Sequence, residues 1–218
     1  MSRAFLHRQA TKAHCFLLRA RRNSEGVAAV EFGFIAPIMV LMLAGTVEIS
    51  RAVTIDRRLG LVTSMIADLV TREESISSTT LLGATSATTD GIYGLVRHIM
   101  GPYDNGTMKV SIIPVKAKPT DATVTKVYAA TTNRPPLNGG VGGSEPALGS
   151  DFALTSGLLD AGGQLIVVKT SYHFTPLLIG YVMGTSTWTD KAIMSPRNSS
   201  GCVDFDNNNC IPSPTIFP

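Results

Sequence analysis

The sequence is poor in charged and aromatic residues. Of its 218 residues, only 16% are charged, against about a quarter in ordinary soluble domains, and 6% are aromatic. The net charge of +3 is unevenly spread, because residues 1–26 carry +5 and the remainder carries −2. The basic character therefore belongs to the N-terminal leader, and no basic face is visible elsewhere. We predict that the protein does not bind nucleic acid.

Histidines are also few, and their spacing matches no motif for catalysis or metal binding. His98 falls on a predicted helix and His173 on a predicted strand, while His7 and His14 lie in the leader. No paired histidine spacing, nucleophile elbow or thiol–histidine arrangement stands out. The sequence therefore predicts no catalytic residue, no metal site and no cofactor. A triad assembled in space from His98 or His173 with a serine and an aspartate stays open.

What the chain does have is one long apolar run. Residues 27–47 are nearly all apolar, and as a helix they would span roughly 31 Å, which matches the ~30 Å hydrocarbon core of a membrane. The run is too long for the apolar core of a secretory signal. Ser50 and Ala52 could mimic a signal-peptidase site, but the helical pattern continues past them. More Lys/Arg precede the run than follow it, which predicts a cytoplasmic N-terminus and an exported body.

A single carboxylate, Glu31, interrupts this run. In the simpler interpretation it is an acid tolerated near the membrane edge, where a charge costs less than the ~2.5–3.5 kcal/mol of the bilayer centre. In the second interpretation it is functional and needs a partner. If a peptidase cuts after Gly26, Val27 becomes the first residue and gains a free ammonium group. That group on a neighbouring subunit is a natural partner for Glu31.

The stretch GVAAVEFGFIAP resembles the processing and helix motif of the TadE-like minor pseudopilins of the tight-adherence (Flp) pilus system. The family pattern is a Gly, four residues, a Glu, an aromatic residue and often a Pro shortly after. Gly26, Glu31, Phe32 and Pro37 match this pattern, although Phe32 stands where the major Flp pilin usually has Tyr. The stretch VVKTSYHFTPLL, residues 167–178, also resembles a downstream strand of the family.

The resemblance implies a pilus assembly protein rather than an enzyme. A prepilin peptidase would cut between Gly26 and Val27, and Glu31, Phe32 and Pro37 would pack against other subunits. The implied partners are this peptidase, other pilins and pseudopilins, the inner-membrane assembly platform and membrane lipid. The implied location is the bacterial inner membrane, with one span and a periplasmic C-terminal domain. Incorporation into the pilus stays open.

An alternative of another class is also open. The chain could be an unprocessed, signal-anchored periplasmic protein, either a binding module or an enzyme, whose activity lies in the exported part. A convergent polar pocket around His98 or His173 would favour this alternative.

The apolar helix is predicted to continue beyond the membrane-length run. Apolar residues recur at threes and fours after residue 47, which predicts one helix over residues 27–72 whose outer half packs on the body. Pro37 lacks an N–H and is expected to bend the helix by disturbing the bond to Gly33. Gly33 and Gly45 are either close-packing positions in a bundle or incidental membrane glycines.

The remaining sequence predicts helices packed on one face of an antiparallel sheet, an α+β fold. A second helix is expected over residues 86–100, ended by Gly101-Pro102. Its apolar side is formed by Ile92, Leu95, Val96 and Ile99. Strands are expected at residues 108–116, 122–130, 165–174 and 185–194. Pro114 indicates that the first of these is an edge strand or ends there.

The predicted organisation has four parts. A basic leader covers residues 1–26, a transmembrane helix residues 27–47, and a helical stalk with the second helix residues 48–100. A mostly β exported region covers residues 101–218, and within it the Gly/Pro-rich stretch NRPPLNGGVGGSEPALGS is expected to be a flexible surface loop.

The three cysteines fit this topology. Cys15 lies in the leader, whereas Cys202 and Cys210 lie in the exported tail and should form a disulfide in an oxidising periplasm, worth roughly 2–3 kcal/mol. A zinc site is poorly supported, because two cysteines lack the further ligands that zinc needs. The tail also resembles the start of a calcium loop, but Asn209 and Thr215 stand where its Gly and bidentate Glu are required.

Overall fold

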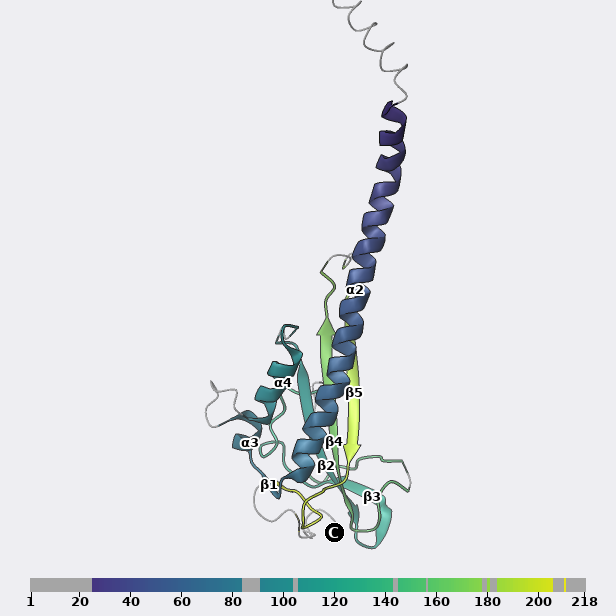
Figure 1. The fold of residues 1–218 in the computed structure, drawn as a ribbon. Coiled ribbons are helices and arrows are strands. Elements are labelled where there is room, and N and C mark those ends of the chain that lie inside the picture. Colours follow the sequence, from purple (N-terminus) through teal and green to yellow (C-terminus); the bar gives the residue numbers. More distant parts are fainter. Residues whose placement is uncertain are drawn as a thin grey trace, which may run out of the picture. The chain divides into compact units, whose positions relative to one another are not determined.

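The computed structural model describes residues 25–83, 91–103, 106–142, 145–155, 157–177, 180, 184–205 and 210. The chain divides into two compact units, Met1–Ile49 and Ser50–Pro218, and the second is called the body below. The helix α2, Glu25–Arg72, contributes to both units (Figure 1). The predicted leader up to residue 24, with Cys15, and the tail positions Asn209 and Thr215 lie outside the described residues.

The long helix is confirmed, and it begins two residues earlier than predicted. Alanine and leucine recur along it, and both are strong helix formers. The helix continues through Pro37, although this residue cannot donate to the carbonyl of Gly33. A bend at Pro37 stays a prediction.

The predicted α+β fold is confirmed, with a four-stranded antiparallel sheet in the body. Its order is β3-β2-β4-β5, formed by the strands Lys109–Lys118 (β2), Asp121–Val127 (β3), Gln164–Phe174 (β4) and Ser186–Met194 (β5). All four lie within three residues of the predicted strands. A second, two-stranded sheet was not predicted: β1 (Ser75–Ile76) pairs in parallel with β6 (Asp204–Phe205).

The prediction for Pro114 is wrong. It lies in the middle of β2, and β2 is a central strand. The carbonyl of Pro114 accepts a hydrogen bond of 3.2 Å from the amide of Tyr128, on the side where β3 lies. The missing N–H points to the same side, because N–H and C=O of one strand residue share a direction. The missing donor therefore faces Tyr128, just beyond the end of β3 at Val127, so the proline lies where the β2–β3 ladder ends.

One face of the sheet packs against the part of α2 that belongs to the body. The helix presents an apolar stripe to β2 and β4, and all its members are at most 1% exposed: Ile55, Leu59, Val62, Ile66, Ala67 and Val70. A polar contact lies inside this interface, where the hydroxyl oxygens of Thr63 and Thr170 are 2.6 Å apart. The outer half of the helix therefore packs on the body as its periodicity predicts.

Two short helices complete this layer, α3 (Ser78–Leu82) and α4 (Ile92–Met100). The predicted apolar side of α4 is only partly right. Val96 is buried, and Ile92 and Ile99 pack at the margin, but Leu95 is not in the core. The buried face is centred on Tyr93, Val96 and Met100, because the Tyr93 hydroxyl donates to the carbonyl of Pro135 at 2.9 Å and draws that side inward.

The second face of the sheet is covered in part by the segment between β3 and β4. Phe152 and Leu154 pack there against a small buried cluster that contains Ile113, Val115 and Val167. Phe152 also carries the ammonium of a neighbouring lysine, Lys169, 5.5 Å from its ring centre.

The interpretation of NRPPLNGGVGGSEPALGS as a flexible surface loop is wrong for its ends. Arg134 is fully buried, and its guanidinium lies 3.0 Å from the carboxylate of Glu145. It also donates to the carbonyls of Ile112 and Ala129, at 2.9 and 3.1 Å, and to that of Pro146. Arginine can be buried at this point because its planar fork satisfies several acceptors at once.

Candidate functional site

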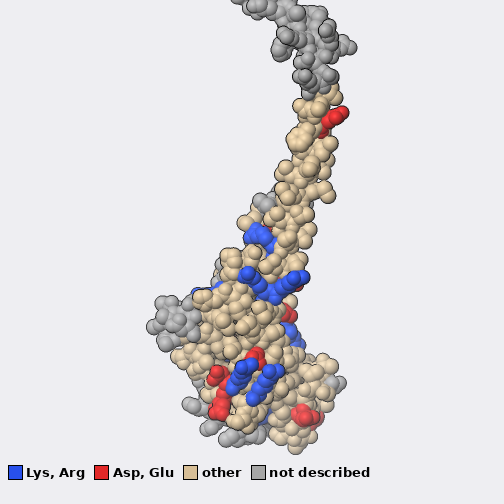
Figure 2. Space-filling view, viewed as in Figure 1, with Lys and Arg blue, Asp and Glu red and all other residues tan. Residues whose placement is uncertain are grey.

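The described residues of the first unit form the N-terminal part of α2. Its large apolar side chains are exposed, from Val27 at 57% through Phe34 at 76% to Val47 at 45%. In Figure 2 this part is tan apart from one acidic patch. An 18-residue window of the helix has a mean hydropathy of 2.2. By length and composition, α2 is therefore compatible with a single-pass membrane anchor.

Glu31 is the one charged residue of the apolar stretch between residues 26 and 47. One helical turn away on either side stand Val27 and Ile35, both exposed and apolar. Residues 25–49, the described part of this unit, contain no lysine or arginine. Among residues 25–49, therefore, no cationic side chain is available to pair with the carboxylate of Glu31.

The glycines of this segment are not required by the packing of the chain itself. A Cβ atom placed on Gly26, Gly33 or Gly45 would meet no heavy atom within 4 Å. Glycine in the interior of a helix costs roughly 0.5–1 kcal/mol relative to alanine. The described residues offer no compensation for this cost at the three positions.

Residues 26–68 match the family model described as TadE-like protein. The chain carries a TadE-like segment. This confirms the resemblance seen in GVAAVEFGFIAP, and the match begins at Gly26 itself. The second resemblance, at residues 167–178, lies outside the TadE-like segment and stays a prediction. No curated protein and no solved structure matches the chain.

The TadE-like segment covers the exposed apolar stretch and most of the stripe that packs on the sheet. Glu31, Phe32 and Pro37 lie in the exposed stretch, and Thr63 lies in the packed one. The TadE-like segment, which suggests involvement in pilus assembly, is thus one continuous stretch of helix with two different environments.

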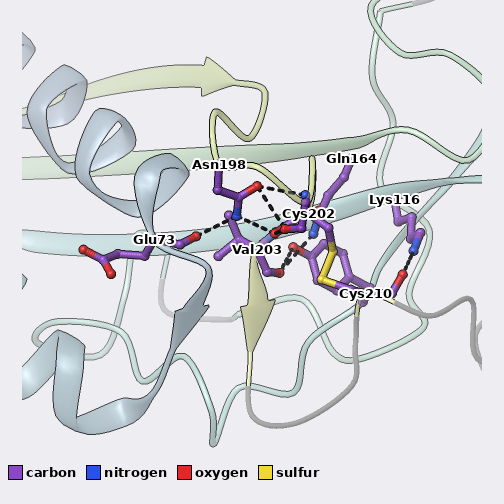
Figure 3. The surroundings of a disulfide bond; sticks show 9 residues. Glu73, Lys116, Gln164, Asn198, Cys202, Val203 and Cys210 are labelled. Atoms are coloured by element: carbon purple, nitrogen blue, oxygen red, sulfur yellow. Dashed lines mark hydrogen bonds between the residues drawn. A yellow bond between two sulfur atoms is a disulfide. The ribbon is translucent and has the colours of Figure 1, made fainter.

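The tail carries the predicted disulfide. Cys202 and Cys210 are joined, with their Cα atoms 5.7 Å apart (Figure 3). Asn198 holds the first cysteine, because its side-chain oxygen accepts from the Cys202 amide at 3.2 Å. Its side-chain nitrogen donates to the carbonyl of Glu73 at 2.8 Å, just beyond the end of α2. The disulfide loop is therefore attached to the end of the long helix.

Three polar side chains of the sheet region also hold this tail, and the sequence did not single them out. Gln164 exchanges two hydrogen bonds with the backbone of Val203, at 3.1 and 3.2 Å, and the Tyr128 hydroxyl donates to the same carbonyl at 2.9 Å. The ammonium of Lys116 donates to the carbonyl of Cys210 at 2.7 Å (Figure 3). Burial lowers the pKa of Lys116 and raises that of Tyr128.

A polar groove of about 840 Å³ lies on the second face of the sheet, around His173. The Nδ1 atom of His173 is 3.1 Å from the hydroxyl oxygen of Thr187. The other lining side chains include Lys109, Asn138 and Ser171, and no carboxylate lines the groove among the described residues. His98 is exposed on α4 and does not line it. Hydroxyl groups and a histidine thus meet here, and none of the described lining residues supplies the acid that a triad needs.

Metal binding finds no further support. In the part of the chain that the structure describes, no three residues among His, Cys, Asp and Glu are placed to hold a metal ion.

Proposed function

We propose that this protein is a membrane-anchored minor pseudopilin, cut by a prepilin peptidase between Gly26 and Val27 and needed for biogenesis of the tight-adherence pilus. Its role is structural, without an active site. The observation that carries the proposal is the TadE-like match that starts at Gly26 and runs directly into an exposed apolar helix.

Glu31, the single acid of the apolar stretch between residues 26 and 47, supports the same function. After cleavage, the ammonium group of Val27 and the carboxylate of Glu31 are four residues apart, or roughly 6 Å along the helix axis. A neighbouring helix displaced by this distance brings its ammonium level with Glu31. The pair would then set the axial step between adjacent subunits in the membrane.

The parts on either side of the apolar stretch suit a cytoplasmic leader and a periplasmic body. The basic leader stays in the cytoplasm under the positive-inside rule, and the disulfide of the tail suits an oxidising compartment. The proposed partners are the peptidase, other pilins and pseudopilins, the inner-membrane assembly platform and lipid. The groove around His173 is the one feature that favours the alternative of a signal-anchored binding module or enzyme. It lacks a carboxylate among its described lining residues, so the pseudopilin function is preferred.

The deciding experiment is the intact mass of the protein extracted from membranes of a strain that contains the matching peptidase. We expect a chain that starts at Val27, and a Gly26→Val variant that keeps the leader. Gly33→Val is the matched control, because a Cβ is equally unobstructed there and processing should be normal. A wild-type chain that starts at Met1 would contradict the proposal.

A further inference from the structure

Among the described residues of the body, one edge of the sheet is covered by further backbone and the other is open. Along β3, the segment that follows it adds hydrogen bonds of 2.7–3.0 Å, from Phe152 to Thr125 and between Val127 and residues 149–150. Farther along the same side, Leu137 and Val110 exchange two more bonds, at 2.9 and 3.4 Å. At the opposite edge lies β5, nine residues long and paired only with β4 (Figure 1). Within the described residues, no other backbone pairs with its outer side.

The register identifies the residues of β5 whose backbone N–H and C=O groups point away from the sheet. The backbone of Val110 bonds to Leu137, on the side away from β4. The backbone N–H and C=O groups of even-numbered residues in β2 therefore point to the β3 side, and those of odd-numbered residues point to β4. Ser111 is opposite Lys169, so the even-numbered residues of β4 bond to β5. The even-numbered residues of β4 are opposite even-numbered residues of β5. The backbone groups of the odd-numbered residues of β5 therefore point outward. The amide of Lys191 agrees, because it donates to the carboxylate of Asp190 at 2.8 Å instead of to β4.

The two faces of β5 differ in chemistry. On one face stand Thr187, Thr189 and Lys191, all exposed. Lys191 is directly opposite Lys169 on β4, which concentrates positive charge there. The neighbouring carboxylate of Asp190 is on the other face, 3.4 Å from where a Cβ on Gly60 would stand. That other face also carries three apolar side chains that are only partly buried: Trp188, Ala192 and Met194.

We propose that β5 is a docking strand, to which an extended segment of a partner protein adds as a fifth strand. Main-chain hydrogen bonds to the outward groups would supply affinity, and alternate side chains would supply specificity. The incoming strand should alternate acidic residues, beside Lys191 and the threonines, with apolar residues beside Trp188 and Met194. A second copy of β5 is a poor occupant, because it would bring another Lys191 to the same positive face. This inference does not depend on cleavage at Gly26.

The test uses the full chain in detergent and a synthetic peptide as long as β5 that alternates Glu and Val. Binding is measured by fluorescence anisotropy, and the site by amide hydrogen exchange. We expect the amides of Thr187, Thr189 and Ile193 to exchange more slowly with the peptide bound, and those of β3 to be unchanged. A peptide that alternates Lys and Val should not bind.

Two variants test the geometry. Thr189→Pro removes an outward N–H but no bond to β4, and proline is tolerated on edge strands, so the chain should fold normally and lose peptide binding. Lys191→Glu should lower the affinity for the acidic peptide on the order of tenfold, since an attractive cross-strand charge pair becomes repulsive. The same change should let the basic peptide bind, because its lysines then meet a carboxylate. Lys118→Glu, at the other end of the sheet, is the matched control. If Thr189→Pro fails to fold, the Lys191→Glu comparison decides.

Several results would overturn the inference. These are equal binding of the acidic and basic peptides, slowed exchange away from β5, unchanged acidic-peptide binding in Lys191→Glu, or a dimer that pairs through β5 without any peptide.

Discussion

The guanidinium of Arg134 and the carboxylate of Glu145 lie 3.0 Å apart in the interior of the body, with 0% and 7% of their side chains exposed. The Glu145 carboxylate also accepts a hydrogen bond from Ser111, and the hydroxyl oxygen of Ser111 accepts from the amide of Val141 at 2.8 Å. One buried pair thus connects both ends of a Gly/Pro-rich segment to the central strand β2.

Removing one member of this pair should be costly. Arg134→Met leaves Glu145 buried without its cation and three backbone carbonyls without a donor, so we expect a loss of about 3–5 kcal/mol in the free energy of unfolding. Arg134→Lys should not restore it, because an ammonium cannot reproduce the planar fork. The measurement is urea unfolding followed by the fluorescence of the single tryptophan, Trp188, which stacks on Phe174.

Arg197 provides the control for that experiment. Its pair with Asp68 is 3.1 Å long but largely exposed, so Arg197→Met should cost at most about 1 kcal/mol. Equal losses in the two methionine variants would show that burial of the Arg134 pair has no energetic consequence.

The buried ammonium of Lys116 predicts how stability depends on pH. Burial lowers its pKa in the folded chain, so between this value and the ordinary ~10.4 the unfolded chain binds more protons. The free energy of unfolding contributed by Lys116 must then rise with pH through that window. Lys116→Met should remove this rise, whereas Lys118→Met should keep it.

The difference between wild type and variant is the quantity to measure, by thermal unfolding at a series of alkaline pH values. Both proteins contain the buried Tyr93 and Tyr128, whose pKa values burial raises, and these act in the opposite direction above about pH 10. Parallel curves for wild type and Lys116→Met would contradict the prediction.

Substitutions of Glu31 test whether this residue is a passive acid or packs against a neighbouring subunit. If it pairs with the Val27 ammonium of a neighbour, Glu31→Leu should leave cleavage and membrane residence intact but abolish piliation. The reason is that the ammonium is stranded in low dielectric, at a cost on the order of 3–5 kcal/mol. Glu31→Asp keeps the charge and shortens the side chain by one methylene, so it should impair piliation less severely.

Pili counted by electron microscopy, with the mature mass checked in the same strain, provide the measurement. Ile35→Leu, one turn away on the same side of the helix, should be neutral. Normal pili in a Glu31→Leu strain with correctly processed protein would contradict the pairing of Glu31 and leave this segment of the helix as a plain membrane anchor.

Local patterns predicted most of the elements of this fold. The period of α2 and the composition of β2 to β5 are properties of neighbouring residues, and both were readable. The order of the strands could not be predicted from local patterns. Pro114 suggests an edge strand, and only the folded structure shows that β3 ends at Val127, next to this proline. Contacts between distant residues leave no local signal either: Arg134 reads as a loop residue, and its acceptors lie on segments up to 22 residues away.

The candidate site follows the same division. Gly26, Glu31, Phe32 and Pro37 form a contiguous pattern, and the family match covers them. The anchors of the tail, such as Gln164 and Val203, are 39 residues apart and meet only in the folded body. The two-residue strands β1 and β6 are too short for any periodicity to reveal.

The position of β6 has a consequence for the order of events during synthesis. Asp204 pairs with Ser75, and Val203 and Phe205 are fully buried. At roughly 5–20 residues per second, the ribosome needs on the order of ten seconds to travel from one partner to the other. By the end of that interval the newborn chain contains the long helix and the strands β2 to β5, but the seam between β1 and β6 is still open, and a chaperone or a protease can reach it. A chain interrupted just before Val203 would carry the whole TadE-like segment and never close.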